Sequence, residues 1–108
     1  MDYLSKIEEI LLIAIWQLKG QAYGYRLRQY IHKSINKEFS YGNLYSALNQ
    51  LEKKGYVEKE IDNQTDSSRG KQKAYYSVTP EGKKALTESK EVHEMLWSNI
   101  TGLDYHVK

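Results

Sequence analysis

Apolar positions along the chain follow two different periods, which divide it into helical and extended segments. From residue 3 to residue 53 they recur every three or four positions, and this spacing predicts three successive helices. Between residues 56 and 79, two short runs rich in β-branched and aromatic residues predict a pair of strands. The helical period then returns and predicts a fourth helix. We therefore expect a mainly α fold with a small β-hairpin.

The first predicted helix, residues 3–19, contains the run ILLIAIW, which is apolar on nearly every side. A domain of this size can bury one face of such a helix, so we expect Leu12 and Trp16 to be left for a partner chain. Crowding inside the domain is the alternative. Gly20 is expected to end the helix. A second helix is predicted at about residues 23–34, with basic residues beside its apolar stripe.

The third predicted helix lies between Ser40, a good N-cap, and Gly55, which suits the left-handed position just past a helix end. Its apolar stripe consists of Leu44, Leu48 and Leu51. The opposite side carries small and hydrogen-bonding residues, none of them acidic, namely Gly42, Ser46, Asn49, Gln50 and Lys53. Such a face suits a helix in a DNA major groove, although an ordinary amphipathic surface helix has the same pattern.

The two predicted strands, residues 56–61 and 73–79, are joined by a polar loop that contains glycine. Arg69, Lys71 and Lys73 lie in or beside this loop, with no acidic residue from 67 to 73. A basic hairpin directly after a recognition-type helix is typical of a wing that meets phosphates or reaches into a minor groove. A solvent-exposed hairpin tip is the alternative.

The last predicted helix begins at Thr79-Pro80-Glu81, where threonine suits the N-cap and proline the first helical position. It runs to about Thr101, and the sequence offers no later element to cover its long apolar side. We therefore expect this helix and the first helix to pair with their copies in a homodimer. The residues expected at this dimer and ligand surface are Leu12, Trp16, Val92, His93, Leu96, Trp97 and Ile100.

This organisation predicts a DNA-binding winged helix-turn-helix domain at residues 1–79, followed by a dimerisation helix and tail at residues 80–108. Two-fold symmetry would present two recognition helices to half-sites ~34 Å apart, about one turn of the duplex.

The composition of the chain mainly excludes other classes of protein. The chain of 108 residues has no cysteine, and its three histidines are far apart, so we expect no disulfide, metal site or cofactor. The longest apolar run, residues 10–16, is too short for a membrane span, and acidic residues near the start do not fit a signal peptide. We expect a cytoplasmic protein without membrane association.

The net charge of +2 decides little, but the charges are separated along the chain. Four basic and no acidic residues lie within 26–37, and the acids gather near both ends of the sequence. Separation of this kind indicates one face suited to a polyanion, although solvated charge runs are common.

Three segments resemble the PadR-type transcriptional regulators, a branch of the winged helix-turn-helix repressors. They are residues 11–25 (LLIAIWQLKGQAYGY), residues 41–57 (YGNLYSALNQLEKKGYV) and residues 69–86 (RGKQKAYYSVTPEGKKAL). The resemblance implies a repressor that binds a pseudo-palindromic operator as a homodimer and releases it on a small-molecule or stress signal. With one helix after the wing, the chain resembles the short members of the family.

The resemblance also indicates which residues meet DNA. Asn43, Tyr45, Ser46 and Asn49 match helix positions that contact DNA in the family, and a tyrosine at position 45 is its usual phosphate contact. A boundary core tyrosine is the alternative for Tyr45. The full set of expected contacts is Ser40, Tyr41, Gly42, Asn43, Tyr45, Ser46, Asn49, Gln50, Lys53, Arg69, Lys71 and Lys73.

Short members of the family bind flat aromatic ligands between subunits, stacked on a tryptophan of the last helix. That tryptophan usually falls where this chain has His93, whereas Trp97 lies four residues further along on the same face. Trp97 and Trp16 are therefore expected either to bind a small aromatic effector or to pack the dimer interface.

Other functions have less support. A winged-helix module that binds protein without DNA would not be retained on heparin or random duplex at low salt. An enzyme is disfavoured because the sequence has no nucleophile beside a base, no phosphate-binding glycine loop and no evident carboxylate pair. A MarR-type regulator would share the wing, but it has a longer first helix and two helices after the wing.

Overall fold

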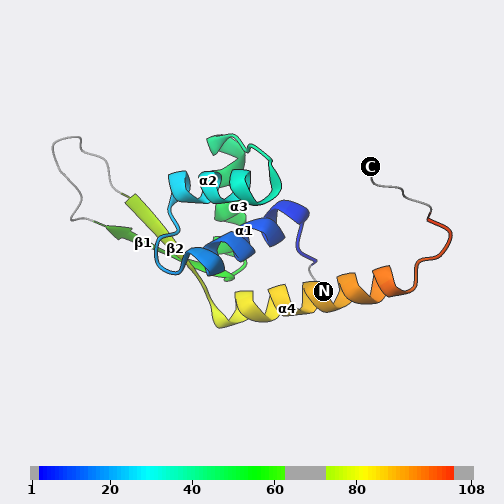
Figure 1. The fold of residues 1–108 in the computed structure, drawn as a ribbon. Helices are drawn as coiled ribbons and strands as arrows, with labels where there is room; N and C mark the ends of the chain where they lie inside the picture. Colours follow the sequence, from blue (N-terminus) through cyan, green and yellow to red (C-terminus); the bar gives the residue numbers. More distant parts are fainter. Residues whose placement is uncertain (1–2, 63–72, 104–108) are drawn as a thin grey trace.

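The computed structural model describes residues 3–62 and 73–103, which form helices and one antiparallel hairpin (Figure 1). In chain order the elements are α1 (Lys6–Leu18), α2 (Gly24–Ile35), α3 (Tyr41–Lys53), β1 (Val57–Asp62), β2 (Lys73–Val78) and α4 (Pro80–Ser98). The predicted order of three helices, a hairpin and a last helix is confirmed. The boundaries differ from the predicted ones by a few residues at most.

Small hydroxyl side chains cap three of the helices in the described part of the chain. Ser5 accepts from the backbone N–H of Glu8 at the start of α1, and Ser40 accepts from that of Asn43 at the start of α3. Thr79 does the same for α4. Such caps satisfy N–H groups that a helix leaves unpaired in its first turn, which explains why the helices begin at these residues.

The hydrophobic core lies between the first three helices and the base of the hairpin. Its largest fully buried side chains are Leu11, Leu12 and Ile15 of α1, Leu27 and Ile31 of α2, and Leu44, Leu48 and Leu51 of α3. The predicted leucine stripe is therefore the core side of α3. Each such side chain contributes roughly 1.5–3 kcal/mol by leaving water, so this stripe fixes which side of α3 remains outside.

One α1 residue that we expected at a partner surface lies in the core instead. Leu12 is 0% exposed within the chain, so the prediction that it is left for a second subunit is wrong. The large exposed side chains in the middle of α1 are Ile13 and Trp16, the latter at 47%. The run ILLIAIW has no polar residue to mark its outer side, and packing against the rest of the domain therefore decides which residue faces outward.

The hairpin is attached to the helices along β2. Val57 lies opposite Val78 at its base, and the strands remain paired to the end of the described part. The N–H of Tyr76 donates to the carbonyl of Ala22 at 2.9 Å, in the link between α1 and α2. This bond joins the wing to the helix-turn-helix unit and sets its direction.

The start of α4 is fixed against the end of α3 and the start of β1. The Thr79 hydroxyl donates to the carbonyl of Gly55 at 2.6 Å, and the Thr79 N–H donates to the carbonyl of Tyr56 at 3.0 Å. Gly82 lies so close to the Tyr56 carbonyl that a Cβ atom there would overlap with it. Glycine at position 82 is therefore required by space.

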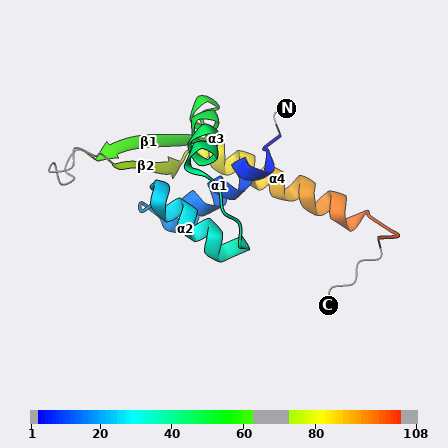
Figure 2. The ribbon, with the colours of Figure 1, turned by 90° about the horizontal axis from the view of Figure 1, so that it is seen from above.

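The second half of α4 extends beyond the other helices, on the side away from the hairpin, in both views of the ribbon (Figures 1 and 2). Large apolar side chains remain exposed on and just after this half, namely Met95, Leu96, Trp97, Ile100 and Leu103. No other described residue covers these side chains enough to bury them.

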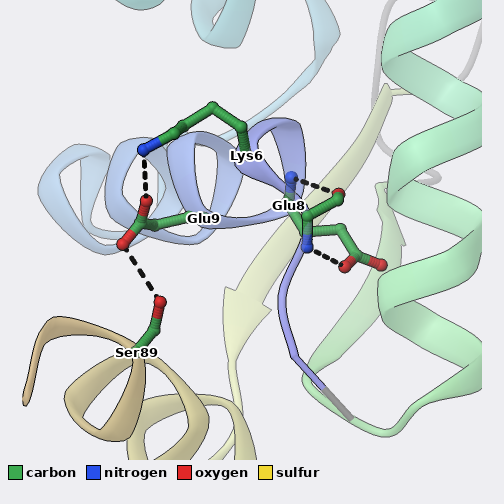
Figure 3. Close-up of polar contacts among 5 residues, drawn as sticks. Lys6, Glu8, Glu9 and Ser89 are labelled. Carbon is green, nitrogen blue, oxygen red and sulfur yellow. Dashed lines mark hydrogen bonds and ion pairs between the residues drawn. The ribbon is translucent and has the colours of Figure 1, made fainter. Parts of the chain in front are cut away.

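Two consecutive glutamates of α1 connect it to its neighbours. The buried Glu8 forms a reciprocal capping pair with Ser5, and its carboxylate lies 2.9 Å from the ammonium of Lys54 at the end of α3. The carboxylate of Glu9 accepts from the hydroxyl of Ser89 on α4 at 3.1 Å (Figure 3). The first turns of α1 therefore hold α3 and α4 in a fixed relation.

Candidate nucleic-acid interface

The outer face of α3 is formed by residues opposite the leucine stripe. Gly42, Ser46, Asn49 and Lys53 are all exposed, and none is acidic. Small residues allow close approach to base edges, and an amide side chain can both donate to and accept from a base. Burial of these side chains would have excluded a role in DNA recognition. Their exposure gives α3 the surface of a recognition helix.

Three other residues predicted to contact DNA lie beside the outer face, two of them on α3 and one at its N-cap. Asn43 and Gln50 are exposed on the flank towards α1, where they line a shallow groove with Ser5 that Ser46 also borders. The hydroxyl oxygen of Ser40 is engaged as the N-cap, at 3.1 Å from the N–H of Asn43. These residues border the outer face without forming its centre.

The opposite flank of α3 carries two stacked tyrosines. The rings of Tyr41 and Tyr45 lie with centroids 6.2 Å apart and planes inclined by 22°. Tyr45 is 40% exposed, and its hydroxyl packs against Gly24 at the start of α2. Tyr45 therefore lies at the boundary between core and surface, and part of its ring remains accessible beside the outer face of α3.

Arg28 of α2 joins this aromatic pair, whereas the sequence indicated it only as one of the basic residues between 26 and 37. Its guanidinium carbon lies 4.5 Å from the centroid of the Tyr41 ring, and its Nε donates to the carbonyl of Phe39 at 2.7 Å. The spacing of Tyr41 and Tyr45 by four residues predicts that they are neighbours on a helix. A partner across the turn between α2 and α3 leaves no such local signal, which explains why this contact was not predicted.

The far end of the described hairpin, where Lys73 pairs with Asp62, brings one more predicted contact to this region. The ammonium of Lys73 lies 4.5 Å from the centroid of the Tyr23 ring, directly before α2. The same ring meets Tyr75 edge to face, with centroids 5.4 Å apart. Lys73 is therefore close to the start of α2. Arg69 and Lys71, the other basic residues predicted for the wing, lie outside the described residues.

The acidic residue on the same side of α3 as Tyr41 and Tyr45 is Glu52, and a lysine lies close to it. The carboxylate of Glu52 lies 4.0 Å from the ammonium of Lys59 on β1. A tyrosine phenol is neutral at physiological pH even at its ordinary pKa of 10.0, and burial, with Tyr45 and Glu52 nearby, raises the pKa of Tyr76 further, to about 12. The flank therefore gains no negative charge from Tyr76.

The second candidate surface lies on α4. His93 and Trp97 pack with ring centroids 6.0 Å apart, and Trp97, Leu96 and Ile100 are exposed, whereas Val92 is half-buried. On α1, Trp16 lies under the ammonium of Lys83, which is 5.5 Å from its ring centroid. Four of the residues predicted for the dimer and ligand surface therefore lie together on α4, and Trp16 lies near its first turn.

A groove of about 420 Å³ runs between the N-terminal segment and α4. Tyr3, Leu4, Val92, Met95 and Leu96 are among its apolar lining residues. His93 also lines this groove, but neither tryptophan does.

In the described part of the chain, no helix has the length and apolar character needed to cross a membrane. The same part contains no group of three or more histidine or acidic side chains arranged to hold a metal ion.

The three-helix unit, the recognition-type face of α3 and the adjoining hairpin define a winged helix-turn-helix protein, as the sequence predicted. Similar solved structures confirm this fold. A transcriptional regulator from Clostridium thermocellum is 26% identical, with a TM-score of 0.71 over 88% of this chain and 92% of that one. A PadR-like transcriptional regulator from Bacillus cereus is 28% identical, with a TM-score of 0.68 over 85% of this chain and 84% of that one.

The model of the transcriptional regulator PadR-like family matches residues 11–88, so the chain belongs to this family. A PadR family transcription regulator from Clostridium difficile is also similar, at 26% identity and a TM-score of 0.68 over 84% of this chain and 91% of that one. No curated protein sequence matches the chain. Membership of a family of transcriptional regulators agrees with the expectation that the protein is not an enzyme.

Proposed function

We propose that this PadR-like regulator is a repressor that binds a pseudo-palindromic operator as a homodimer in the cytoplasm. The observation that carries the proposal is the exposed face of α3, where Gly42, Ser46, Asn49 and Lys53 present no acidic group. Tyr45 and Arg28 border this face on the α2 side, and Lys73 lies over Tyr23, directly before α2. Amide and cationic donors on one side of a rigid helix suit base edges and phosphates.

We assign DNA binding and dimerisation to two different parts of the chain. Residues 1–79 would contact DNA, and residues 80–108 would pair two subunits through α4. Exposed large apolar side chains on and just after α4, among them Leu96 at 67% exposure, support this pairing because monomers rarely expose many such side chains together. A two-fold axis through this contact would present two copies of α3 to half-sites ~34 Å apart.

We further propose that a flat aromatic effector relieves repression by binding at α4. The neighbouring rings of His93 and Trp97, inclined by 43°, offer exposed aromatic surface, with Trp97 at 56% exposure. Glu9 and Ser89 join α4 to α1, and Glu8 joins α1 to the end of α3. A ligand that shifts α4 would therefore change the spacing of the two recognition helices through these contacts.

The experiment that tests the proposal is selection of bound duplexes from a random pool by the purified full chain. A palindromic consensus, with affinity that falls steeply as salt rises, is the expected result. Binding without sequence preference would refute the operator, and no retention on DNA or heparin at low salt would favour a protein-binding module. A repression assay with the selected operator before a reporter gene then separates a repressor from an activator.

A further inference from the structure

Arg28 connects three segments of the helix-turn-helix unit through one side chain. From the second turn of α2, its Nε donates to the carbonyl of Phe39, which lies in the turn directly before the N-cap of α3. Its guanidinium lies over the ring of Tyr41, the first residue of α3, and that ring stacks on Tyr45. Arg28 therefore defines where the chain enters α3 and how the tyrosine pair stands beside it.

The contacts of Arg28 use only part of its hydrogen-bonding capacity. Guanidinium has five N–H donors, and the structure assigns the Nε donor to Phe39. The two Nη atoms donate no hydrogen bond to any described residue, and the side chain is half-buried at the surface. The bond to Phe39 and the contact with Tyr41 together restrict how the guanidinium can turn, which limits the directions of these donors before any ligand arrives.

Tyr41 and Tyr45 depend on this arrangement because both are substantially exposed. Besides the cation over the Tyr41 ring, the pair is supported by the contact of the Tyr45 hydroxyl with Gly24. A stacked cation contributes more when it is partly desolvated, as Arg28 is between α2 and the turn. The Phe39 contact and the ring contact reinforce each other, since each fixes the same side chain.

On the basis of the DNA-binding role proposed above, we propose that Arg28 is a positioning residue for operator recognition. It holds the Tyr41–Tyr45 pair at the edge of α3 and directs its Nη donors to a backbone phosphate of the same duplex. Lysine at this position would keep the charge, but it has neither the Nε donor geometry nor the planar surface. Charge alone therefore does not account for the role of Arg28.

The test compares Arg28→Lys with Arg26→Lys, a matched control on the same helix. Arg26 is half-buried like Arg28, and it makes no hydrogen bond, ion pair or ring contact with the described residues. Each variant is titrated against the selected operator and against a random duplex, at several salt concentrations. We expect Arg28→Lys to weaken operator binding roughly tenfold and to leave random-duplex binding and its salt dependence almost unchanged. Arg26→Lys should change neither.

A second pair of variants separates stacking from charge. Tyr41→Phe keeps the ring and should bind the operator like the wild type, whereas Tyr41→Ala should show the same loss as Arg28→Lys. The double variant with both changes should lose little more than either single variant, because both act through one contact. If Arg28→Lys fails to fold, as thermal unfolding would reveal, the comparison of Tyr41→Phe with Tyr41→Ala decides the question alone.

Two results would overturn the inference while leaving the proposed function intact. The first is operator binding by Arg28→Lys equal to that of the wild type. The second is an equal loss on operator and random duplex, which would make Arg28 a nonspecific charge. A wild-type protein with no operator preference would instead refute the proposed function, and this inference with it.

Discussion

The hydroxyl group of Tyr45 lies against Gly24, at the place where any other residue would carry its Cβ atom. The contact joins the second turn of α3 to the first turn of α2 and keeps the tyrosine ring at the edge of the recognition face. Gly24 lies within α2 and has no positive φ, so glycine is needed here for space rather than for backbone conformation. The residue matched to a phosphate contact is thus positioned by a glycine on another helix.

The variant Gly24→Ala should displace Tyr45 and weaken the packing of α2 on α3. We expect a loss of about 1 kcal/mol in the free energy of unfolding, because the methyl group overlaps the end of a half-exposed phenol that can turn aside. Urea denaturation measures this loss. In a Tyr45→Phe background the same glycine change should cost less, since the overlapping oxygen is gone, and an equal cost in both backgrounds would argue against the contact.

Gly42→Ala should separate stability from DNA binding. Gly42 is exposed on α3, and a Cβ there meets only the Ser40 hydroxyl, at 3.9 Å. Alanine should therefore stabilise the helix by about 0.5–1 kcal/mol. The added methyl group would stand on the face proposed to approach DNA, so operator affinity should fall while the melting temperature rises. If the variant bound the operator as tightly as the wild type, DNA would not approach this part of α3.

The ion pair between Glu8 and Lys54 should make stability depend on pH. Burial favours the neutral form of Glu8, but the hydrogen bond from the Ser5 N–H and the attraction of Lys54 outweigh it, and the pKa of the carboxyl lies below its ordinary value of 4.5. Because the folded state has the lower pKa, the stabilising contribution is present above pH 4.5 and is lost as the pH falls through the folded-state pKa.

Denaturation of the wild type and of Glu8→Gln tests this dependence. At pH 7 the variant should be less stable by about 2 kcal/mol, since the half-buried Lys54 loses its charged partner. The difference between the two proteins should shrink as the pH falls below 4.5. Glu94→Gln, an exposed change on α4, serves as the control and should have no effect at either pH. A constant difference at all pH values would contradict the assignment.

Leu96→Glu should convert the proposed dimer to a folded monomer. Leu96 is exposed within one chain, so the change costs the subunit little, whereas a buried carboxylate at a subunit interface is strongly unfavourable. Sedimentation velocity should show half the mass of the wild type, with an unchanged circular dichroism spectrum. Glu94→Lys, an exposed charge change on the same helix, is the matched control. A wild-type monomer, or a variant that stays dimeric, would rule out this interface.

The parts of the fold that depend on neighbours in sequence could be predicted from it. Leu44, Leu48 and Leu51 recur at helical spacing, and Ser40 and Thr79 are caps whose partners lie three residues away. These features identify the helices and the core side of α3 because each depends on local geometry alone. The exposure of Ser46 and Asn49 then follows from the same helical period.

Features that depend on contacts between distant segments could not be predicted in this way. The apolar run of α1 gave no indication that Leu12 faces the core and Ile13 the outside. The contacts of Arg28 with Phe39 and Tyr41 cross a turn, and no spacing rule connects those positions. The position of Lys73 over Tyr23 likewise depends on how the hairpin folds back to the start of α2.

The central claim is that the outer face of α3 reads DNA, and Asn49 tests it most directly because it is exposed at the middle of that face. The measurement is a second selection from the random pool with Asn49→Ala, compared with the wild-type consensus. We expect the base preference to be lost or changed at one position in each half-site, related by the two-fold axis, with the rest of the consensus retained. An identical consensus for both proteins would contradict the account.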